Sequence, residues 1–122
     1  MLRQETAKSL VKKYLGRLPI KVDAAILFGS TATNNRLAES DIDLIIISED
    51  FKQMALPQRF LILQKNWQSK TDLEAFGFTK EEFDNLKNKS IVLQEAVEYG
   101  IKLEIKNSKS KPKLTLTNSP AL

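Results

Sequence analysis

The spacing of apolar and polar positions along the chain predicts eight elements. Apolar residues recur every three or four positions in four stretches, as expected of helices, while four shorter runs are β-branched or alternate as strands do. The predicted order is helix, strand, strand, helix, strand, helix, helix and strand, over residues 5–15, 22–28, 41–48, 51–67, 71–76, 79–88, 90–99 and 101–105. This order predicts a small α/β (α+β) domain, with a mixed sheet and helices mainly on one side.

Local sequence signals set the ends of several predicted helices. Thr79 and Glu82 have the spacing of a capping box, and Gly100 follows the last predicted helix. Pro57 is tolerable near a first helical turn. Trp67 is interpreted as a core anchor, because a large aromatic side chain on the apolar face of a helix is usually buried.

The strand at residues 41–48 carries the most informative chemistry. Its run from Leu44 to Ile47 has no polar face, which predicts a central, covered strand. Asp41 and Asp43 point to the same side, because side chains alternate along a strand. Two adjacent like charges are costly to desolvate unless a cation lies between them. A divalent ion such as Mg²⁺, which prefers oxygen ligands, fits this pair.

A glycine turn precedes this strand by ten residues. Gly29-Ser30 ends the strand at residues 22–28, and glycine lets the backbone approach a ligand closely. A later strand at residues 71–76 offers a third carboxylate, with Asp72 and Glu74 on one face. The sequence therefore predicts a turn able to hold phosphates close to a metal-binding group of carboxylates. The residues alone leave open whether Asp72 or Glu74 completes the group.

Gly29-Ser30, ten residues and then Asp41-x-Asp43-Leu44 resembles the signature of the DNA polymerase beta nucleotidyltransferase superfamily. The short chain is similar to its minimal nucleotidyltransferase branch, over residues 11–106. The resemblance implies that a nucleoside triphosphate, ATP above all, binds with Mg²⁺. The spacing from residue 74 to the capping box favours Glu74 over Asp72. The implied nucleotide-binding residues are Gly29 and Ser30, with Ser40 just before the carboxylates, and the implied catalytic and metal-binding residues are Asp41, Asp43 and Glu74. Arg36, in the loop between the motifs, is a further candidate contact to a phosphate, and the alternative is an exposed loop arginine.

The resemblance also implies a partner. Minimal nucleotidyltransferases of this size are often antitoxins of a helical HEPN-family toxin and can transfer AMP to a hydroxyl of that toxin. In this chain the turn reads Thr31-Ala-Thr33, where the family often has two arginines. The alternative is therefore an antitoxin that binds nucleotide, has little or no catalytic activity and neutralises its partner by binding alone.

Composition limits the types of catalysis, the cellular location and the partners that the sequence allows. The chain has 122 residues and neither Cys nor His, which excludes disulfides and histidine-based acid–base catalysis. No apolar run approaches the roughly 18 residues of a spanning helix, so a cytoplasmic protein without membrane contact is expected. The net charge of +4 lies in residues 106–122, expected to be a disordered basic tail after a neutral domain at 1–105. Nucleic acid is disfavoured as a partner, and self-association is left open.

Overall fold

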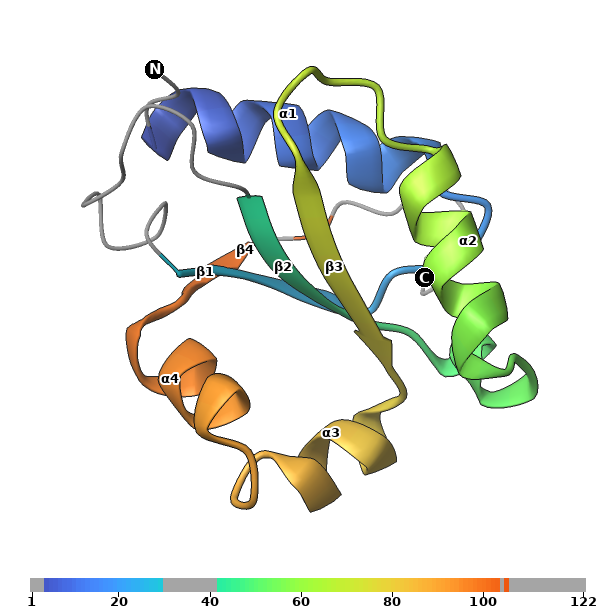
Figure 1. Ribbon diagram of the computed structural model, residues 1–122, viewed down its shortest axis with the longest axis vertical. Coiled ribbons are helices and arrows are strands. Elements are labelled where there is room, and N and C mark those ends of the chain that lie inside the picture. The colour runs from blue at the N-terminus through green and yellow to red at the C-terminus, as the bar shows by residue number, and fades with distance from the viewer. Residues whose placement is uncertain (1–3, 30–41, 104, 106–122) are drawn as a thin grey trace, which may run out of the picture.

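The computed structural model describes residues 4–29, 42–103 and 105, which form four helices, a short 3₁₀ helix and four strands (Figure 1). The helices are α1 (Gln4–Arg17), α2 (Leu56–Lys65), α3 (Lys80–Leu86) and α4 (Ile91–Tyr99), and the 3₁₀ helix is η1 (Glu49–Gln53). The strands are β1 (Ala24–Phe28), β2 (Ile42–Ile47), β3 (Leu73–Phe78) and β4 (Ile101–Leu103). The predicted element order is confirmed. The expected tail at residues 106–122 lies outside the described residues.

The four strands form one mixed sheet in the order β3-β2-β1-β4. β1 pairs antiparallel with both β2 and β4, whereas β2 and β3 run parallel. Parallel neighbours need a crossover connection, and η1 and α2 provide it. The prediction that the strand with Asp43 is central is confirmed, and the strand with Glu74 lies beside it.

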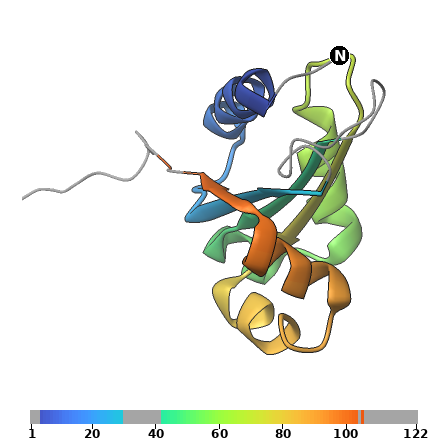
Figure 2. The ribbon, with the colours of Figure 1, turned by 90° about the vertical axis from the view of Figure 1, so that its left-hand side faces the viewer.

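Helices cover both faces of the sheet, as the view along it shows (Figure 2). The larger hydrophobic cluster joins α1 and Leu63 of α2 to one face, which includes Leu44 and Ile46. Phe83 of α3 and Leu93 of α4 belong to a smaller cluster on the other face. The mixed sheet and the α+β class are as predicted, but the helices do not lie mainly on one side: α1 and α2 pack against one face, and α3 and α4 against the other. β2 has no polar face after Asp43 because both of its faces are covered.

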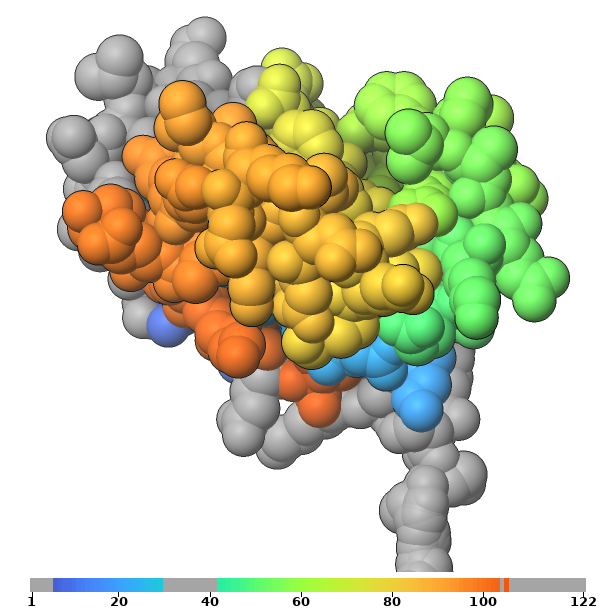
Figure 3. Space-filling model, turned by 90° about the horizontal axis from the view of Figure 1, so that it is seen from below, coloured from blue at the N-terminus to red at the C-terminus, as the bar shows by residue number. Residues whose placement is uncertain are grey.

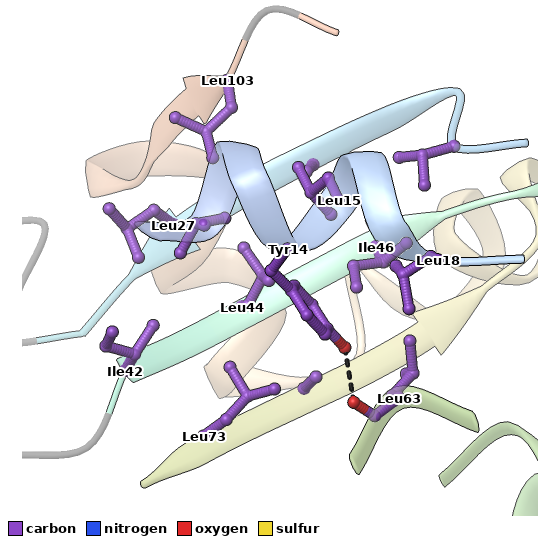
Figure 4. Packing of buried hydrophobic residues seen from close by; sticks show 14 of the residues in the cluster. Tyr14, Leu15, Leu18, Leu27, Ile42, Leu44, Ile46, Leu63, Leu73 and Leu103 are labelled. Carbon is purple, nitrogen blue, oxygen red and sulfur yellow. Dashed lines mark hydrogen bonds between the residues drawn. The ribbon is translucent and has the colours of Figure 1, made fainter. Parts of the chain in front are cut away.

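Tyr14 and Trp67 connect helix α1 to the chain beyond α2. The Tyr14 hydroxyl donates a hydrogen bond of 2.7 Å to the carbonyl of Leu63 (Figure 4). The Trp67 ring meets the Tyr14 ring edge-on, with centroids 5.1 Å apart, and packs against the larger cluster. Trp67 thus serves as the predicted core anchor. Burial raises the pKa of Tyr14 well above its ordinary value, so this hydroxyl keeps its proton near neutral pH.

Helices α3 and α4 form a layer over the second face, seen from below in Figure 3. The predicted capping box is present at the start of α3, where Thr79 and Glu82 bond each other's backbone N–H groups. Ser90 caps α4 by accepting from the Leu93 N–H. No helix in the described ranges has both the length and the apolar character needed to cross a membrane.

The single helix predicted over residues 51–67 is wrong, because two helices occupy this stretch. η1 ends at Gln53, and α2 begins at Leu56 with Pro57 in its first turn. Proline has no N–H to donate and is tolerated only at such a position. The helical spacing of Phe60 and Leu63 predicts that both lie on one apolar face, but Leu63 is buried and Phe60 is 57% exposed.

Arg59 joins α2 to β3 and α3. Its side chain, only 6% exposed as a residue, forms two hydrogen bonds with the Glu82 carboxylate, at 2.7 and 3.0 Å. It also donates to the carbonyls of Met54 and Gly77, at 3.1 and 3.0 Å. The guanidinium carbon lies 5.4 Å from the centre of the Phe51 ring. Each nitrogen of this buried guanidinium therefore donates at least one hydrogen bond.

This ion pair predicts an acid-sensitive contribution to stability. The hydrogen bond from Arg59 lowers the pKa of the Glu82 carboxyl, and partial burial opposes the shift. A lowered folded-state pKa stabilises the protein above the unfolded value, which is about 4.3. The contribution is lost as pH falls through the folded-state pKa. We expect Glu82→Gln to flatten the pH dependence of the urea midpoint between about pH 5 and pH 3. Glu81→Gln, at an exposed neighbour, is the matched control and is expected to leave that dependence unchanged.

Candidate functional site

Asp43 and Glu74 lie opposite each other on neighbouring strands. The parallel register pairs Asp43 of β2 with Glu74 of β3. Directly opposed residues point to the same face of a sheet, and here it is the face that also carries Ile45 and Ile47 toward α3 and α4. Phe28 of β1 is opposite Asp43 on its other side. The row therefore runs Phe28, Asp43, Glu74 across three strands, at the end of β3 distant from α3.

Gly29 brings the predicted phosphate turn against Asp43. Its φ is 77°, in the left-handed region that favours glycine. A Cβ atom built at Gly29 would collide with the Asp43 carboxylate. The backbone of this turn therefore approaches the carboxylate more closely than any other residue type would allow. This contact confirms that the turn and the carboxylate strand meet.

The structure places three of the predicted site residues, and the others fall outside the described ranges. Gly29, Asp43 and Glu74 come together at the end of the sheet. Those outside are Ser30, Arg36, Ser40 and Asp41. No group of three or more acidic, His or Cys residues able to hold a metal occurs within the described part. Asp43 is half-buried and Glu74 exposed, so two carboxylates with access to solvent face the same side, a donor set that fits a hard divalent cation.

Asp72 lies just before β3, on the same approach. Its backbone carbonyl accepts a 2.9 Å hydrogen bond from the Ile42 N–H, which fixes the start of the parallel pairing. Its side chain is exposed. Glu74, and not Asp72, is the residue in register with Asp43. In this register the Asp43 carboxylate is opposite Glu74. The residue opposite Asp72 lies outside the described ranges.

A groove not foreseen from the sequence adjoins the carboxylates. It has a volume of about 650 Å³ and lies between α2 and β3, lined among others by Leu56, Phe60, Asp72, Glu74 and Phe76. Three of these residues are large apolar groups with exposed fractions of 69%, 57% and 42%, at Leu56, Phe60 and Phe76 respectively. The sequence signal that was available is the pair Leu56 and Phe60, four residues apart on a helix and hence on one side of it.

Gly29→Ala is expected to damage the site and destabilise the fold. The left-handed backbone costs a non-glycine residue roughly 1–2 kcal/mol, and the added methyl group must displace the Asp43 carboxylate. Gly16→Ala is the matched control, because a Cβ at Gly16 meets nothing within 4 Å, and alanine in a helix stabilises by roughly 0.5–1 kcal/mol. Thermal unfolding with and without ATP and Mg²⁺ measures both effects. Equal stability of Gly29→Ala and the parent protein would contradict this account.

The structure is thus an α+β domain in which a parallel strand pair with opposed carboxylates lies beside a glycine turn. The profile of the family described as "Nucleotidyltransferase domain" matches residues 7–113. The chain therefore belongs to the nucleotidyltransferase domain family. No curated protein sequence matches it.

Solved structures share this fold. A chain of a toxin–antitoxin complex with AMP-PNP has a TM-score of 0.59 and 23% identity, covering 84% of this chain and 76% of that one. A chain from a complex of a tri-AMPylated Shewanella oneidensis HEPN toxin with its MNT antitoxin gives 0.54 and 22%, covering 87% and 76%. A chain of a mutant MntA toxin–antitoxin complex gives 0.56 and 22%, covering 84% and 75%. At these identities the likeness shows the fold.

Proposed function

We propose that this chain transfers AMP from ATP to a hydroxyl group of a partner protein, and that the partner is a HEPN-family toxin. The observation that carries the proposal is the register of Asp43 with Glu74 beside the close approach of Gly29. Membership of the nucleotidyltransferase family supports the type of reaction. The fold shared with chains of toxin–antitoxin complexes, one holding AMP-PNP and one an AMPylated HEPN toxin, supports the donor and the acceptor.

Each residue has a distinct part in the proposed mechanism. The turn at Gly29 and Ser30 binds the β- and γ-phosphates through its backbone, and Ser40 and Arg36 assist. The carboxylates of Asp41, Asp43 and Glu74 would hold Mg²⁺, which neutralises phosphate charge in such sites. Glu74 accepts the proton of the attacking hydroxyl. The hydroxyl oxygen bonds to the α-phosphorus, the bond from that phosphorus to the bridging oxygen breaks, and pyrophosphate leaves.

Labelled nucleotide tests the proposal directly. The chain is incubated with ATP labelled at the α-phosphate, MgCl₂ and a helical protein of an adjacent gene that carries an Arg-x-x-x-x-His motif. We expect label on that protein with the parent chain and none with the variant Asp41→Asn, Asp43→Asn. Glu95→Gln, Glu98→Gln, at two exposed positions on α4, removes the same number of charges and should label fully.

The same assay separates catalysis from binding. If the helical protein is neutralised but never labelled, the catalytic proposal fails and neutralisation by binding alone remains. The absence of arginines at Thr31 and Thr33 is the feature that favours this second outcome, because fewer cations then face the phosphates. Thermal unfolding in millimolar ATP and Mg²⁺ reports nucleotide binding independently of transfer.

A further inference from the structure

The groove between α2 and β3 has the composition of a polypeptide-binding site. Its walls are apolar where Leu56, Phe60 and Phe76 are exposed, and its lining also includes the acids Asp72 and Glu74. Arg59 also lines it, but the Glu82 carboxylate pairs with this cation. The groove thus combines an apolar surface with two carboxylates that form no ion pair with any other residue in the described ranges. Contiguous exposed apolar surface of this kind marks interaction sites.

The outer edge of β3 carries backbone N–H and C=O groups that a bound peptide could pair with. The carbonyl of Asp72 accepts from Ile42 at the start of β2, and that of Phe78 accepts from Ser48 just after β2. The backbone groups of the residues between them therefore alternate, and those of Leu73, Ala75 and Gly77 face outward. Gln64 donates to the Leu73 carbonyl at 3.0 Å, and Arg59 to the Gly77 carbonyl at 3.0 Å. Side chains of α2 therefore already occupy the outward carbonyls at both ends of this edge. Ala75, which lines the groove, lies between them with its N–H and C=O directed outward.

The in-line geometry of the proposed transfer indicates which substrate binds in this groove. In phosphoryl transfer the attacking and leaving oxygens are roughly in line, on opposite sides of the phosphorus. Gly29 lies at the β1 end of the carboxylate row, so the departing pyrophosphate occupies that end. The attacking hydroxyl must then arrive from the β3 end, past Glu74. The groove is the apolar surface that adjoins this end.

We propose, on the basis of the function proposed above, that the groove between α2 and β3 binds an extended segment of the protein acceptor, which presents its hydroxyl to Glu74. An apolar side chain near that hydroxyl packs between Phe60 and Phe76. The segment's backbone pairs with the outward N–H and C=O of Ala75, a single rung of β-strand addition. Asp72 favours a cationic residue on the segment, since exposed opposite charges attract.

A random peptide array provides the test. Decapeptides, each with one Ser, Thr or Tyr, are incubated with the chain, MgCl₂ and ATP labelled at the α-phosphate. Binding of the same peptides, made fluorescent, is measured by anisotropy without nucleotide. We expect labelled and bound peptides to carry a large apolar residue close to the hydroxyl. The double variant Leu56→Ser, Phe60→Ser should weaken binding and labelling at least tenfold while preserving stabilisation by ATP and Mg²⁺.

The matched control is Ile91→Ser, Val92→Ser on α4, where the two side chains are 82% and 47% exposed and lie outside the groove. This control should bind and label as the parent does. Peptides that bind through Leu56 and Phe60 but are never labelled would support the groove and overturn the proposed transfer. Labelling that is unchanged in the groove variant, or absence of peptide binding up to millimolar concentration, would overturn the groove.

Discussion

Glu74→Gln is expected to lower the rate of AMP transfer by on the order of a hundred- to ten-thousand-fold, the range for loss of a positioned general base. Glutamine keeps the size of the side chain but accepts no proton. Because Glu74 is exposed, the thermal unfolding midpoint should not change. Single-turnover labelling of the partner protein at saturating ATP measures the rate.

Asp43→Asn should remove stabilisation by ATP and Mg²⁺ as well, since Asp43 contacts the turn at Gly29.

Asp72→Asn is the matched control for Glu74→Gln. It removes the same charge two residues earlier on the chain, at a position whose backbone and not whose side chain contacts β2. We expect transfer to the whole partner protein within about threefold of the parent rate, because Asp72 lines the acceptor groove but acts there only through a weak, screened attraction. A large loss at Asp72 with full activity at Glu74 would assign the third carboxylate to Asp72.

Arg59→Met is expected to destabilise the fold by about 2–4 kcal/mol. Methionine fills much of the same space but leaves the carbonyls of Met54 and Gly77 without their donor and removes the Glu82 ion pair. Urea unfolding, read as a change of midpoint at constant slope, measures the loss. Lys65→Met, at an exposed position on the same helix, is the control. A change below about 0.5 kcal/mol, the usual range for surface substitutions, would contradict the account.

A second variant separates the ion pair from the backbone contacts. Glu82→Gln removes the charge but leaves Arg59 bonded to both carbonyls, and its side chain is 40% exposed, so water can replace the carboxylate. We therefore expect a smaller loss than for Arg59→Met. An equal loss of unfolding free energy in the two variants would show that the ion pair, and not the contacts of Arg59 with the carbonyls of Met54 and Gly77, stabilises the fold.

Local signals were sufficient to predict much of this fold. The run after Asp43 predicted a covered central strand, and the spacing of Thr79 and Glu82 predicted the start of α3; both are confirmed. The turn at Gly29 and the strand at Asp43 were expected to meet, and they do. Such features depend on short stretches of sequence whose backbone preferences agree with the tertiary structure.

Features that depend on long-range packing could not be predicted. Phe60 has the helical spacing of a core residue, yet it faces the groove, because Arg59 and Leu63 occupy the buried side of α2. Nothing in the sequence around Arg59 indicates that its partners lie at Gly77 and Glu82. The roles of Ser30, Arg36, Ser40 and Asp41 stay predictions, since these residues lie outside the described ranges.

The pairing of β2 with β3 makes the site depend on alignment between two distant parts of the chain. Asp43 and Glu74 share a face only because one strand is in its present register with the other. Shifting β3 by a single residue would turn Glu74 toward α1 and bring Leu73 or Ala75 to the nucleotide side. The part of the connection between Trp67 and Thr71 can therefore change in length with little effect on the chemistry, whereas one residue inserted inside β3 would abolish it. A screen of single-residue insertions along this stretch would test this, with activity kept for insertions between Trp67 and Thr71 and lost for insertions within β3.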